Sequence, residues 1–277
     1  MTDGLPLSLQ PLPPGAVVPL ADEDATLQGD ESSKSDLRDE LDRLSERIDA
    51  LQRALNAEGS RALLVVLQGR DASGKDGVLR KVFGPVDPLG LIATSFKAPT
   101  ELERRHDFLW RVHREVPPHG VIGVFNRSHY EDVLVVRVRG LAPESVWRPR
   151  YEQINCFERI LLAGGTVILK FMLHISREEQ RERLLARLEN PEKYWKFNAG
   201  DLKERELWDA YTAAYREMIE RTSTPVAPWY LVPADRKPVR DVLIARTVVE
   251  TLERMNPRYP GAPPELEALR SALAKRD

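Results

Sequence analysis

The sequence is poor in the features that mark disulfide-bonded, secreted or membrane-spanning proteins. It has one cysteine in 277 residues, Cys156, which excludes a disulfide framework and a cysteine-built zinc site. We expect this residue to be a small buried thiol. No window of about 18 residues is apolar and uncharged, so we predict no membrane span. The first residues lack a basic stretch followed by an apolar one, so we predict a cytoplasmic protein without a secretory signal.

The chain also lacks a strong net charge, because 41 Lys and Arg nearly balance 43 Asp and Glu to give −2. This balance argues against a strongly basic nucleic-acid-binding protein. The charges are unevenly spread, however. Residues 1–36 hold 7 acids and a single base, which leaves 40 bases and 36 acids on residues 37–277. The body is therefore mildly basic, and an anionic partner stays compatible with it.

The N-terminal 36 residues and the rest of the chain read as different kinds of segment. Five prolines and a run of acids predict that residues 1–36 form a flexible or loosely packed tail. From Leu37 to Leu55, leucine and isoleucine recur at spacings of three and four, which is one face of a helix. We expect this face to pack on the protein's own core, with a subunit contact as the alternative.

The body, residues 37–277, alternates strand and helix patterns. Almost wholly apolar strands separated by helices predict a parallel sheet covered on both faces, with ligand-binding loops at one edge. Five strands are predicted, at Ala62–Gln68, Ile92–Lys97, Val121–Asn126, Thr166–Ile175 and Pro228–Pro233. Helices are predicted at Lys75–Phe83, Glu101–Val116, Glu144–Leu162, Ser176–Leu188, Asp201–Thr222 and Arg236–Met255.

The first strand of the body runs into a phosphate-binding pattern. Residues 69–77, here called the Walker loop, match G-x-x-x-x-G-K between a buried strand and a helix. Gly69 and Gly74 allow backbone N–H groups to converge on an anion, and the helix N-terminus adds partial positive charge. Lys75 supplies a fixed cation for phosphate oxygens. A structural glycine-rich turn is the alternative interpretation.

Two acids make this loop unusual. Asp76 stands where Ser or Thr normally holds magnesium, and Asp71 lies inside the loop. A carboxylate among phosphates repels them unless a cation intervenes, so we infer that Asp71 helps to hold Mg²⁺. The alternative is an N-cap for the following helix, a role better suited to Asp76.

The third strand ends in a second polar motif, residues 126–132, which resembles a Walker B position. Arg127 at the end of a buried strand indicates an anionic partner, and a phosphate suits its two-pronged guanidinium. Glu131 or Asp132 would support magnesium, or would cap a helix or pair with nearby arginines. We expect His129 to be structural.

A basic segment follows the fourth strand. Arg183 and Arg187 share one helix face, and Lys193 and Lys196 extend that row past a break at Pro191. Its position after the fourth strand of a P-loop fold favours an anion-binding lid, because nucleotide kinases close basic lids there. The alternative is a solvated face in which interleaved acids pair with the bases.

Taken together, these motifs resemble the polyphosphate kinase 2 family. The Walker loop, the run from Phe125 to Val133, and Asn190-Pro191-x-Lys193-x-Trp195-Lys196 carry the resemblance. Phe96-Lys97-Ala98-Pro99-Thr100 and the stretch 106–111 add to it, and it spans about Leu37 to Tyr259. Many members have Asp where this chain has Asn126. That departure, followed by Ser-His-Tyr-Glu-Asp, is similar to the subgroup accepting both AMP and ADP.

The resemblance implies a three-layer α/β/α P-loop kinase fold like that of thymidylate kinase, with a five-stranded parallel sheet and a helical lid at about residues 177–205. It implies reversible, Mg²⁺-dependent phosphoryl transfer between inorganic polyphosphate and nucleotides, from AMP to ADP and from ADP to ATP, with Mn²⁺ as the alternative metal. It also implies a homo-oligomer, a dimer or tetramer, with no nucleic-acid or membrane partner.

The resemblance assigns roles to individual residues. The catalytic group is Asp71, Lys75 and Arg127, with Asp71 on the metal, helped by Glu131 or Asp132. The nucleotide would be bound by Asn126, Arg127, Glu131 and Asp132. Polyphosphate would be bound by Gly69, Ala72, Ser73, Gly74, Lys75, Asp76, Gly77, Arg183, Arg187, Lys193 and Lys196.

The mechanism expected from these charges is positioning and electrostatic stabilisation, because phosphoryl transfer needs little covalent chemistry. Two other functions are compatible with the same fold. One is an ATP-dependent kinase for a nucleotide or small molecule, and the other is a non-catalytic P-loop binding module.

Overall fold

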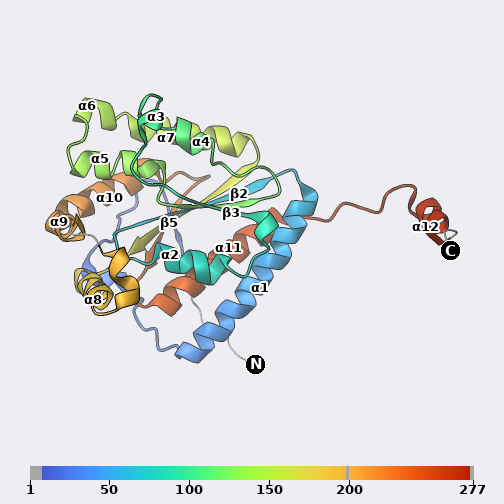
Figure 1. The fold of residues 1–277 in the computed structure, drawn as a ribbon, viewed down its shortest axis with the longest axis horizontal. Coiled ribbons are helices and arrows are strands. Elements are labelled where there is room, and N and C mark those ends of the chain that lie inside the picture. Colours follow the sequence, from blue (N-terminus) through green and yellow to red (C-terminus); the bar gives the residue numbers. More distant parts are fainter. Residues whose placement is uncertain (1–7, 198–199, 275–277) are drawn as a thin grey trace.

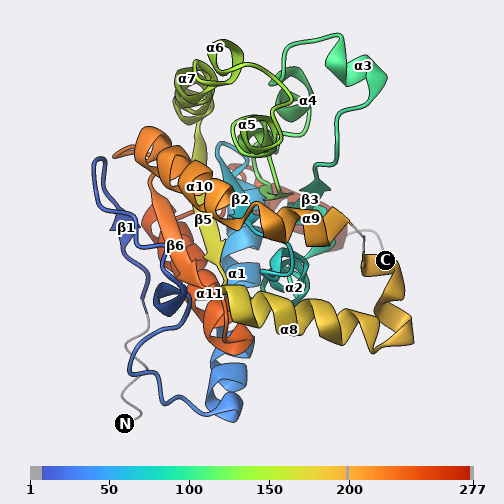
Figure 2. The same ribbon diagram turned by 90° about the vertical axis from the view of Figure 1, so that its left-hand side faces the viewer.

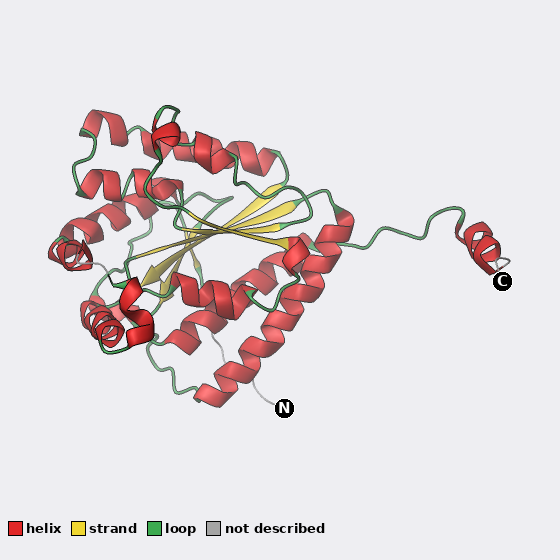
Figure 3. Ribbon diagram, in the orientation of Figure 1, coloured by secondary structure: helices red, strands yellow, loops and turns green. Residues whose placement is uncertain are grey.

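A computed structural model of the chain describes residues 8–197 and 200–274. A six-stranded sheet with the order β1-β6-β5-β2-β4-β3 forms its centre. Figure 3 shows this sheet between two layers of helices, and Figure 1 labels the elements. The α/β/α fold class expected from the alternating pattern is thus confirmed.

Five of the strands are parallel, and their apolar side chains explain why they lie inside. They are β2 (Ala62–Gly69), β3 (Leu91–Ser95), β4 (Ile122–Asn126), β5 (Thr166–His174) and β6 (Trp229–Pro233). Every residue of β2 is buried, because β4 and β5 pair with it on either side and helices cover both faces. The edge strand β3 has only half-buried and exposed positions.

One face of the sheet is covered by α1 (Lys34–Glu58), α2 (Lys75–Val78) and α11 (Lys237–Met255). Helix α2 continues as a turn of π-helix through Phe83. The predicted apolar face of α1 packs in this layer: Leu37, Ile48 and Leu55 are fully buried beside α11. Packing on the protein's own core, and not a subunit contact, accounts for this stripe.

The other face is covered mainly by α7 (Arg150–Ala163) and α10 (Trp208–Thr222). Four short helices complete the layer near them, namely α3 (Glu101–Arg104), α4 (Trp110–His113), α5 (Val135–Val138) and α6 (Glu144–Trp147). The predicted helices at 101–116 and 144–162 are therefore each divided in two. Pro149, the residue before α7, separates α6 from α7.

Two segments extend from the body. Helix α8 (Arg177–Leu188), a 3₁₀ turn (Pro191–Lys196) and α9 (Gly200–Glu206) form the region expected to be the lid, which Figure 2 shows beside α2 and α10. Residues 198–199 of that region lie outside the described residues. After α11 the chain runs out to α12 (Leu266–Ala274), which stands away from the body in Figure 1.

Residues 8–33 differ from the loosely packed tail that their composition predicts. Strand β1 (Pro11–Leu12) pairs antiparallel with β6, which makes the sheet six-stranded where five strands were expected. Val18 and Ala25 are buried, and a ring nitrogen of His174 lies 2.7 Å from the carbonyl oxygen of Ala21. A few apolar side chains anchor the segment despite its acids. Residues 1–7 of the predicted tail lie outside the described residues.

Two smaller observations concern exposure. Cys156 is exposed on α7, so the prediction of a buried thiol is wrong; its side chain lies on the outer face, beside Glu152 and Arg159. The described part of the chain contains no helix long and apolar enough to cross a membrane.

The strand order brings the polar motifs together. After β2 the chain builds β3 and β4 on one side, and then crosses to build β5 and β6 on the other. The ends of β2, β4 and β5 are therefore neighbours: Leu67 pairs with Asn126, and Gly69 pairs with Leu173. Sheets of this kind bind ligands at such a switch in strand order.

Candidate phosphoryl-transfer site

The Walker loop connects β2 to α2 and encloses the ammonium group of Lys75. Lys75 Nζ donates to the carbonyl oxygens of Gly69 at 2.6 Å and Arg70 at 3.1 Å. An ammonium group has three donors, so the loop holds it in place with two and one remains for a ligand. Burial, followed by the nearby Arg127 cation, lowers the pKa of Lys75 to about 8.

Gly74 is required by both its conformation and its surroundings. It is the N-cap of α2, with φ of 104°, a region that side chains rarely adopt. A Cβ atom at this position would overlap the Arg240 guanidinium. The N-cap role considered for Asp71 or Asp76 is therefore wrong, since a backbone position without a side chain caps the helix.

Arg127 joins the two motifs. Its Nη2 donates to Asp71 Oδ1 at 2.5 Å, and its Nη1 donates to Glu131 Oε2 at 3.2 Å. Its backbone has φ of 62°, uncommon for a residue with a side chain, and its N–H donates to the Leu67 carbonyl of β2. Burial alone would lower the pKa of Arg127, but the Glu131 and Asp71 carboxylates reverse this and raise it.

Buried polar groups hold the loop after β4 in place. With its amide oriented to satisfy both atoms, Gln68 donates to Glu131 Oε1 at 3.0 Å and accepts from Ser128. Deeper in, Tyr130 donates to Glu158 Oε1 at 2.6 Å, and Lys170 donates to the other oxygen of Glu158 at 2.7 Å. His129 lies buried among these groups, which agrees with the structural role expected of it.

A long groove runs over the Walker loop between α8 and the ends of β3 and β4, and ten basic and four acidic residues line it. The basic residues are Lys75, Arg80, Lys97, Arg127, Arg183, Arg187, Lys193, Lys196, Lys237 and Arg240, and the acidic ones are Asp71, Asp76, Glu179 and Glu182. The lining therefore carries a net charge of +6, whereas residues 37–277 as a whole carry +4. The groove is therefore suited to a polyanion.

The predicted lid contributes four basic residues to the lining of this groove: Arg183, Arg187, Lys193 and Lys196. Lys196 Nζ lies 3.8 Å from Asp76 Oδ2, and Asn126 donates to the other oxygen of Asp76 at 2.8 Å. Asp76 thus connects the lid, the Walker loop and β4. In contrast, Arg181 is exposed and pairs with Glu178, so this part of α8 is the solvated face considered as the alternative.

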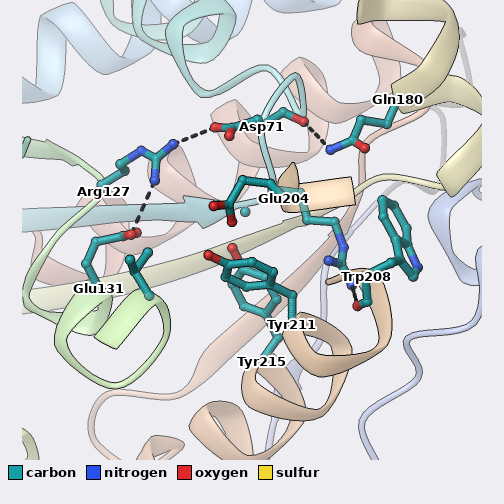
Figure 4. A pocket seen from close by; sticks show the side chains of 11 residues that line it. Asp71, Arg127, Glu131, Gln180, Glu204, Trp208, Tyr211 and Tyr215 are labelled. Atoms are coloured by element: carbon teal, nitrogen blue, oxygen red, sulfur yellow. Dashed lines mark hydrogen bonds and ion pairs between the residues drawn. The ribbon is translucent and has the colours of Figure 1, made fainter. Parts of the chain in front are cut away.

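A smaller pocket lies on the other side of the Asp71–Arg127 pair. Figure 4 shows Asp71, Arg127 and Glu131 facing Tyr211 and Tyr215 of α10 across it. The pocket is also lined by Gly69, Arg70, Val135, Gln180, Glu204 and Trp208. The Arg70 guanidinium lies 3.8 Å from the centre of the Trp208 ring, and its Nη2 donates to the Trp208 carbonyl, so the loop is anchored to α10.

Most, but not all, of the residues predicted for the site line these two cavities. Asp71, Ala72, Gly74, Lys75, Asp76, Gly77, Asn126 and Arg127 line the groove with the lid residues, whereas Gly69 and Glu131 line the smaller pocket. Ser73 is completely buried and lines neither cavity.

Asp132 differs most from its predicted role. It is buried away from both cavities and accepts from Arg150 at 3.1 Å, with an Arg111 nitrogen at 3.9 Å. Burial raises the pKa of Asp132 to about 6, against the effect of the two arginines. Its neighbour Glu131 turns toward Arg127 instead. Of the two acids proposed to assist the metal, only Glu131 therefore lies near Asp71.

Sequence reasoning missed four basic groups of the groove: Arg80, Lys97, Lys237 and Arg240. For two of them a signal was available. Lys237 and Arg240 lie in the first turn of α11, which contains no acid. Cations at a helix N-terminus oppose the helix dipole, so bases there indicate a nearby anion.

The residues present suit a divalent cation held largely by its substrate. Asp71 has one carboxylate oxygen on Arg127, and its side chain, 28% exposed, lines the groove. Within residues 8–197 and 200–274, no three His, Cys, Asp or Glu side chains converge as a metal cage. Mg²⁺ typically takes one or two carboxylates together with substrate phosphate oxygens and waters. A single carboxylate beside a basic groove fits that pattern.

Comparisons with known proteins support this geometry. The family model described as "Polyphosphate kinase 2" matches residues 31–260. An AMP/ADP-polyphosphate phosphotransferase of Meiothermus ruber is 54% identical over 217 residues, covering 78% of this chain and 81% of that protein. An ADP-polyphosphate phosphotransferase of Rhodopseudomonas palustris is 44% identical over 255 residues, covering 86% and 87%.

A solved structure resembles this one over nearly its whole length. The crystal structure of polyphosphate kinase 2 from Arthrobacter aurescens TC1 superposes with a TM-score of 0.90, at 41% identity and with 95% of each chain covered.

Proposed function

The chain belongs to the polyphosphate kinase 2 family, and from that premise we propose that it transfers phosphoryl groups from inorganic polyphosphate to AMP and to ADP. One observation supports this most strongly: a groove with ten basic residues passes over a Walker loop. A chain of phosphates carries negative charge along its whole length, which matches a long basic groove better than a compact acceptor does.

The polyphosphate lies along the groove in this proposal, with one phosphate at the Walker loop. Lys75, the loop N–H groups and the first turn of α2 contact that phosphate. Arg187, Lys193 and Lys196 on the lid side and Lys237 on α11 neutralise neighbouring phosphates. Arg127 faces the acceptor, because it lies where the groove and the smaller pocket meet.

The transfer itself needs positioning more than acid–base chemistry. The acceptor oxygen belongs to a nucleotide phosphate that is already anionic, so it needs no strong general base. The positive charges of Lys75 and Arg127 stabilise the transferred phosphoryl group as its oxygens gain negative charge. Asn126 and Glu131 help to position the nucleotide, since both lie within a few residues of Arg127.

Enzymes of this family use a divalent metal ion. We propose Mg²⁺, with Mn²⁺ as the alternative, held by the outward oxygen of Asp71. Bound there, the ion would neutralise phosphate oxygens that the Asp71 carboxylate otherwise repels. Glu131 acts indirectly, by keeping Arg127 in place.

Further parts of the proposal follow from the family resemblance. We propose that residues 37–277 form one phosphotransferase domain in which about 177–205 act as the lid. We also propose a homo-oligomer, a dimer or tetramer. The α1 stripe is buried in the monomer and supplies no interface, so another surface would have to do so. Light scattering measures the assembly directly.

The deciding experiment separates three functions. The protein is incubated with AMP, long-chain polyphosphate and Mg²⁺, and the nucleotides are separated by chromatography. Formation of ADP and then ATP supports the proposal. If polyphosphate gives no product, but a parallel incubation with ATP in its place does, the protein is an ATP-dependent kinase. Nucleotide binding without any product would indicate a binding module.

A further inference from the structure

Arg183 of α8 makes contacts with the Walker loop that differ from those expected of a lid residue. Its Nη1 donates to the carbonyl oxygens of Ala72 at 2.9 Å and Ser73 at 3.2 Å. Its Nε donates to the Glu179 carboxylate at 2.7 Å, one turn earlier on the same helix. The residue is only 8% exposed. These bonds attach the lid helix to the backbone of the phosphate-binding loop.

The remaining nitrogen of Arg183 reaches a third element. Nη2 donates to the carbonyl oxygens of Ala234 and Asp235 at 2.7 Å each, in the turn between β6 and α11. A guanidinium has five N–H donors, and these five contacts account for the whole set. A phosphate oxygen would therefore have to displace a bond that Arg183 already makes. Glu179 also balances its charge locally.

A second buried arginine meets the same loop from α11. Arg240 Nη1 donates to the Ser73 carbonyl oxygen at 3.1 Å, while its Nε and Nη2 donate to Asp241 at 2.9 and 2.7 Å. The two guanidiniums thus share one loop carbonyl. In a planar trans peptide the next N–H points opposite to the carbonyl, so the Gly74 N–H is directed away from both arginines. Gly74 lines the groove.

We propose that Arg183 is a positioning residue for phosphoryl transfer, which fixes the Walker loop, helix α8 and the β6–α11 turn in one arrangement and leaves polyphosphate contacts to other groups. The proposal rests on the proposed function. It revises the role that the family resemblance implied for Arg183, which was polyphosphate binding. All five N–H donors of Arg183 are already bonded to protein atoms, so the side chain holds the Walker loop in its conformation. Arg240 supports the same carbonyl from the other side.

This role predicts a particular kinetic signature for Arg183→Lys. Lysine keeps the positive charge but has three donors and no planar fork, so it cannot remake five bonds to four carbonyls and a carboxylate. We expect kcat to fall about 10- to 100-fold, with KM for polyphosphate within about twofold of wild type. This pattern is typical of a residue that affects the transition state and not substrate binding. A direct phosphate contact would give the opposite pattern: a preserved kcat and a raised KM.

Matched variants keep the test interpretable. Arg181→Lys lies two residues away on the exposed face of α8 and should leave both constants unchanged. Lys193→Met, on the groove rim, should raise KM for polyphosphate. If Arg183→Lys does not fold, Glu179→Gln weakens one of the bonds that hold Arg183 by removing the charge of its partner. This variant should lower kcat about two- to fivefold at constant KM. Melting temperatures of all variants accompany the kinetics.

The outcomes separate this inference from the proposed function. A wild-type enzyme that makes no product from polyphosphate overturns both. A wild type that turns over, with an Arg183→Lys or Glu179→Gln variant that raises KM at unchanged kcat, overturns only the positioning role. Full activity of Arg183→Lys overturns it as well. A fall in kcat at constant KM, without a matching fall in Arg181→Lys, supports it.

Discussion

Arg127 donates to Asp71 at 2.5 Å and to Glu131 at 3.2 Å, so one guanidinium links the Walker loop to the loop after β4. The two acids approach it from different motifs, and its backbone adopts a left-handed conformation to reach them. This arrangement places a cation between the groove and the smaller pocket. The bond from Arg127 uses Oδ1 of Asp71, whose side chain also lines the groove, where we propose that it holds the metal ion.

We expect Arg127→Lys to lower kcat by about 10²- to 10³-fold, because lysine has a single nitrogen in place of the two guanidinium nitrogens that reach Asp71 and Glu131 separately. The measurement is steady-state transfer from polyphosphate to AMP, with the melting temperature as a check on folding. Arg216→Lys on α10, which lines neither cavity, serves as the control. Near-wild-type kcat in Arg127→Lys would contradict the assignment.

The lowered pKa of Lys75, about 8, predicts an alkaline limit to activity. The charged form binds phosphate, so kcat/KM for polyphosphate should fall as the pH rises through about 8. The fall in kcat should come at a higher pH than the fall in kcat/KM, because bound phosphates stabilise the charged form of Lys75. A kcat/KM profile that stays flat to pH 10, the region of an ordinary lysine, would contradict the buried setting of Lys75.

The same shift has a consequence for stability with a definite sign. Between about 8 and the ordinary value of 10.5, the folded protein binds fewer protons at Lys75 than the unfolded chain does. The contribution of Lys75 to the free energy of unfolding therefore rises with pH in that window. Comparing urea unfolding of wild type and Lys75→Met between pH 8 and 10 isolates it, since the variant lacks this slope. If the free energy of unfolding changed with pH equally in both proteins, a lowered pKa of Lys75 in the folded state would be contradicted.

Asp132→Asn should affect stability and leave nucleotide binding intact. Asp132 pairs with Arg150 and Arg111 away from both cavities, and an amide leaves the half-buried Arg150 without this acidic partner and Arg111 with Glu103 at 3.9 Å. We expect a loss of about 1–3 kcal/mol in the free energy of unfolding with an unchanged KM for AMP. Denaturant titration and steady-state kinetics measure the two quantities. An Asp132→Asn protein of normal stability with a raised KM would restore the role predicted from the motif.

Lys237→Met should weaken polyphosphate binding selectively. Burial and the neighbouring cations Arg183, Arg240 and Lys193 lower the pKa of Lys237, so it belongs to the concentrated charge of the groove. We expect KM for long-chain polyphosphate to rise about two- to tenfold, with KM for AMP unchanged and a weaker dependence on salt. Lys34→Met, on an exposed residue outside the groove, is the matched control. Equal effects of both variants would refute a specific contribution from Lys237.

The parts of the site that lie close together along the chain were predictable from the sequence. The order strand, glycine-rich loop and helix over residues 62–83 requires only local chemistry, so the backbone arrangement around Lys75 was predicted correctly. Arg127 was placed beside them because parallel strands end at one edge of the sheet. These inferences depend on periodicity and on glycine, which are visible without a structure.

The orientation of individual side chains was not predictable in the same way. Glu131 and Asp132 are adjacent, yet one faces Arg127 and the other faces Arg150, and composition does not distinguish them. Arg183 lies on the predicted face of α8, but its acceptors come from segments 110 and 51 residues away in the chain. The packing of residues 8–33 on the body also depends on a few tertiary contacts, which the acidic composition of this segment does not indicate.

The central claim is that the Walker loop transfers a phosphoryl group taken from polyphosphate. The most direct measurement supplies ³²P-labelled polyphosphate, AMP and Mg²⁺ to wild type and to Lys75→Ala, and follows label in ADP and ATP. We expect labelled ADP followed by labelled ATP with wild type, and a rate about 10²- to 10³-fold lower with a folded Lys75→Ala variant. Unlabelled nucleotides with wild type, or equal rates for the two proteins, would contradict the account.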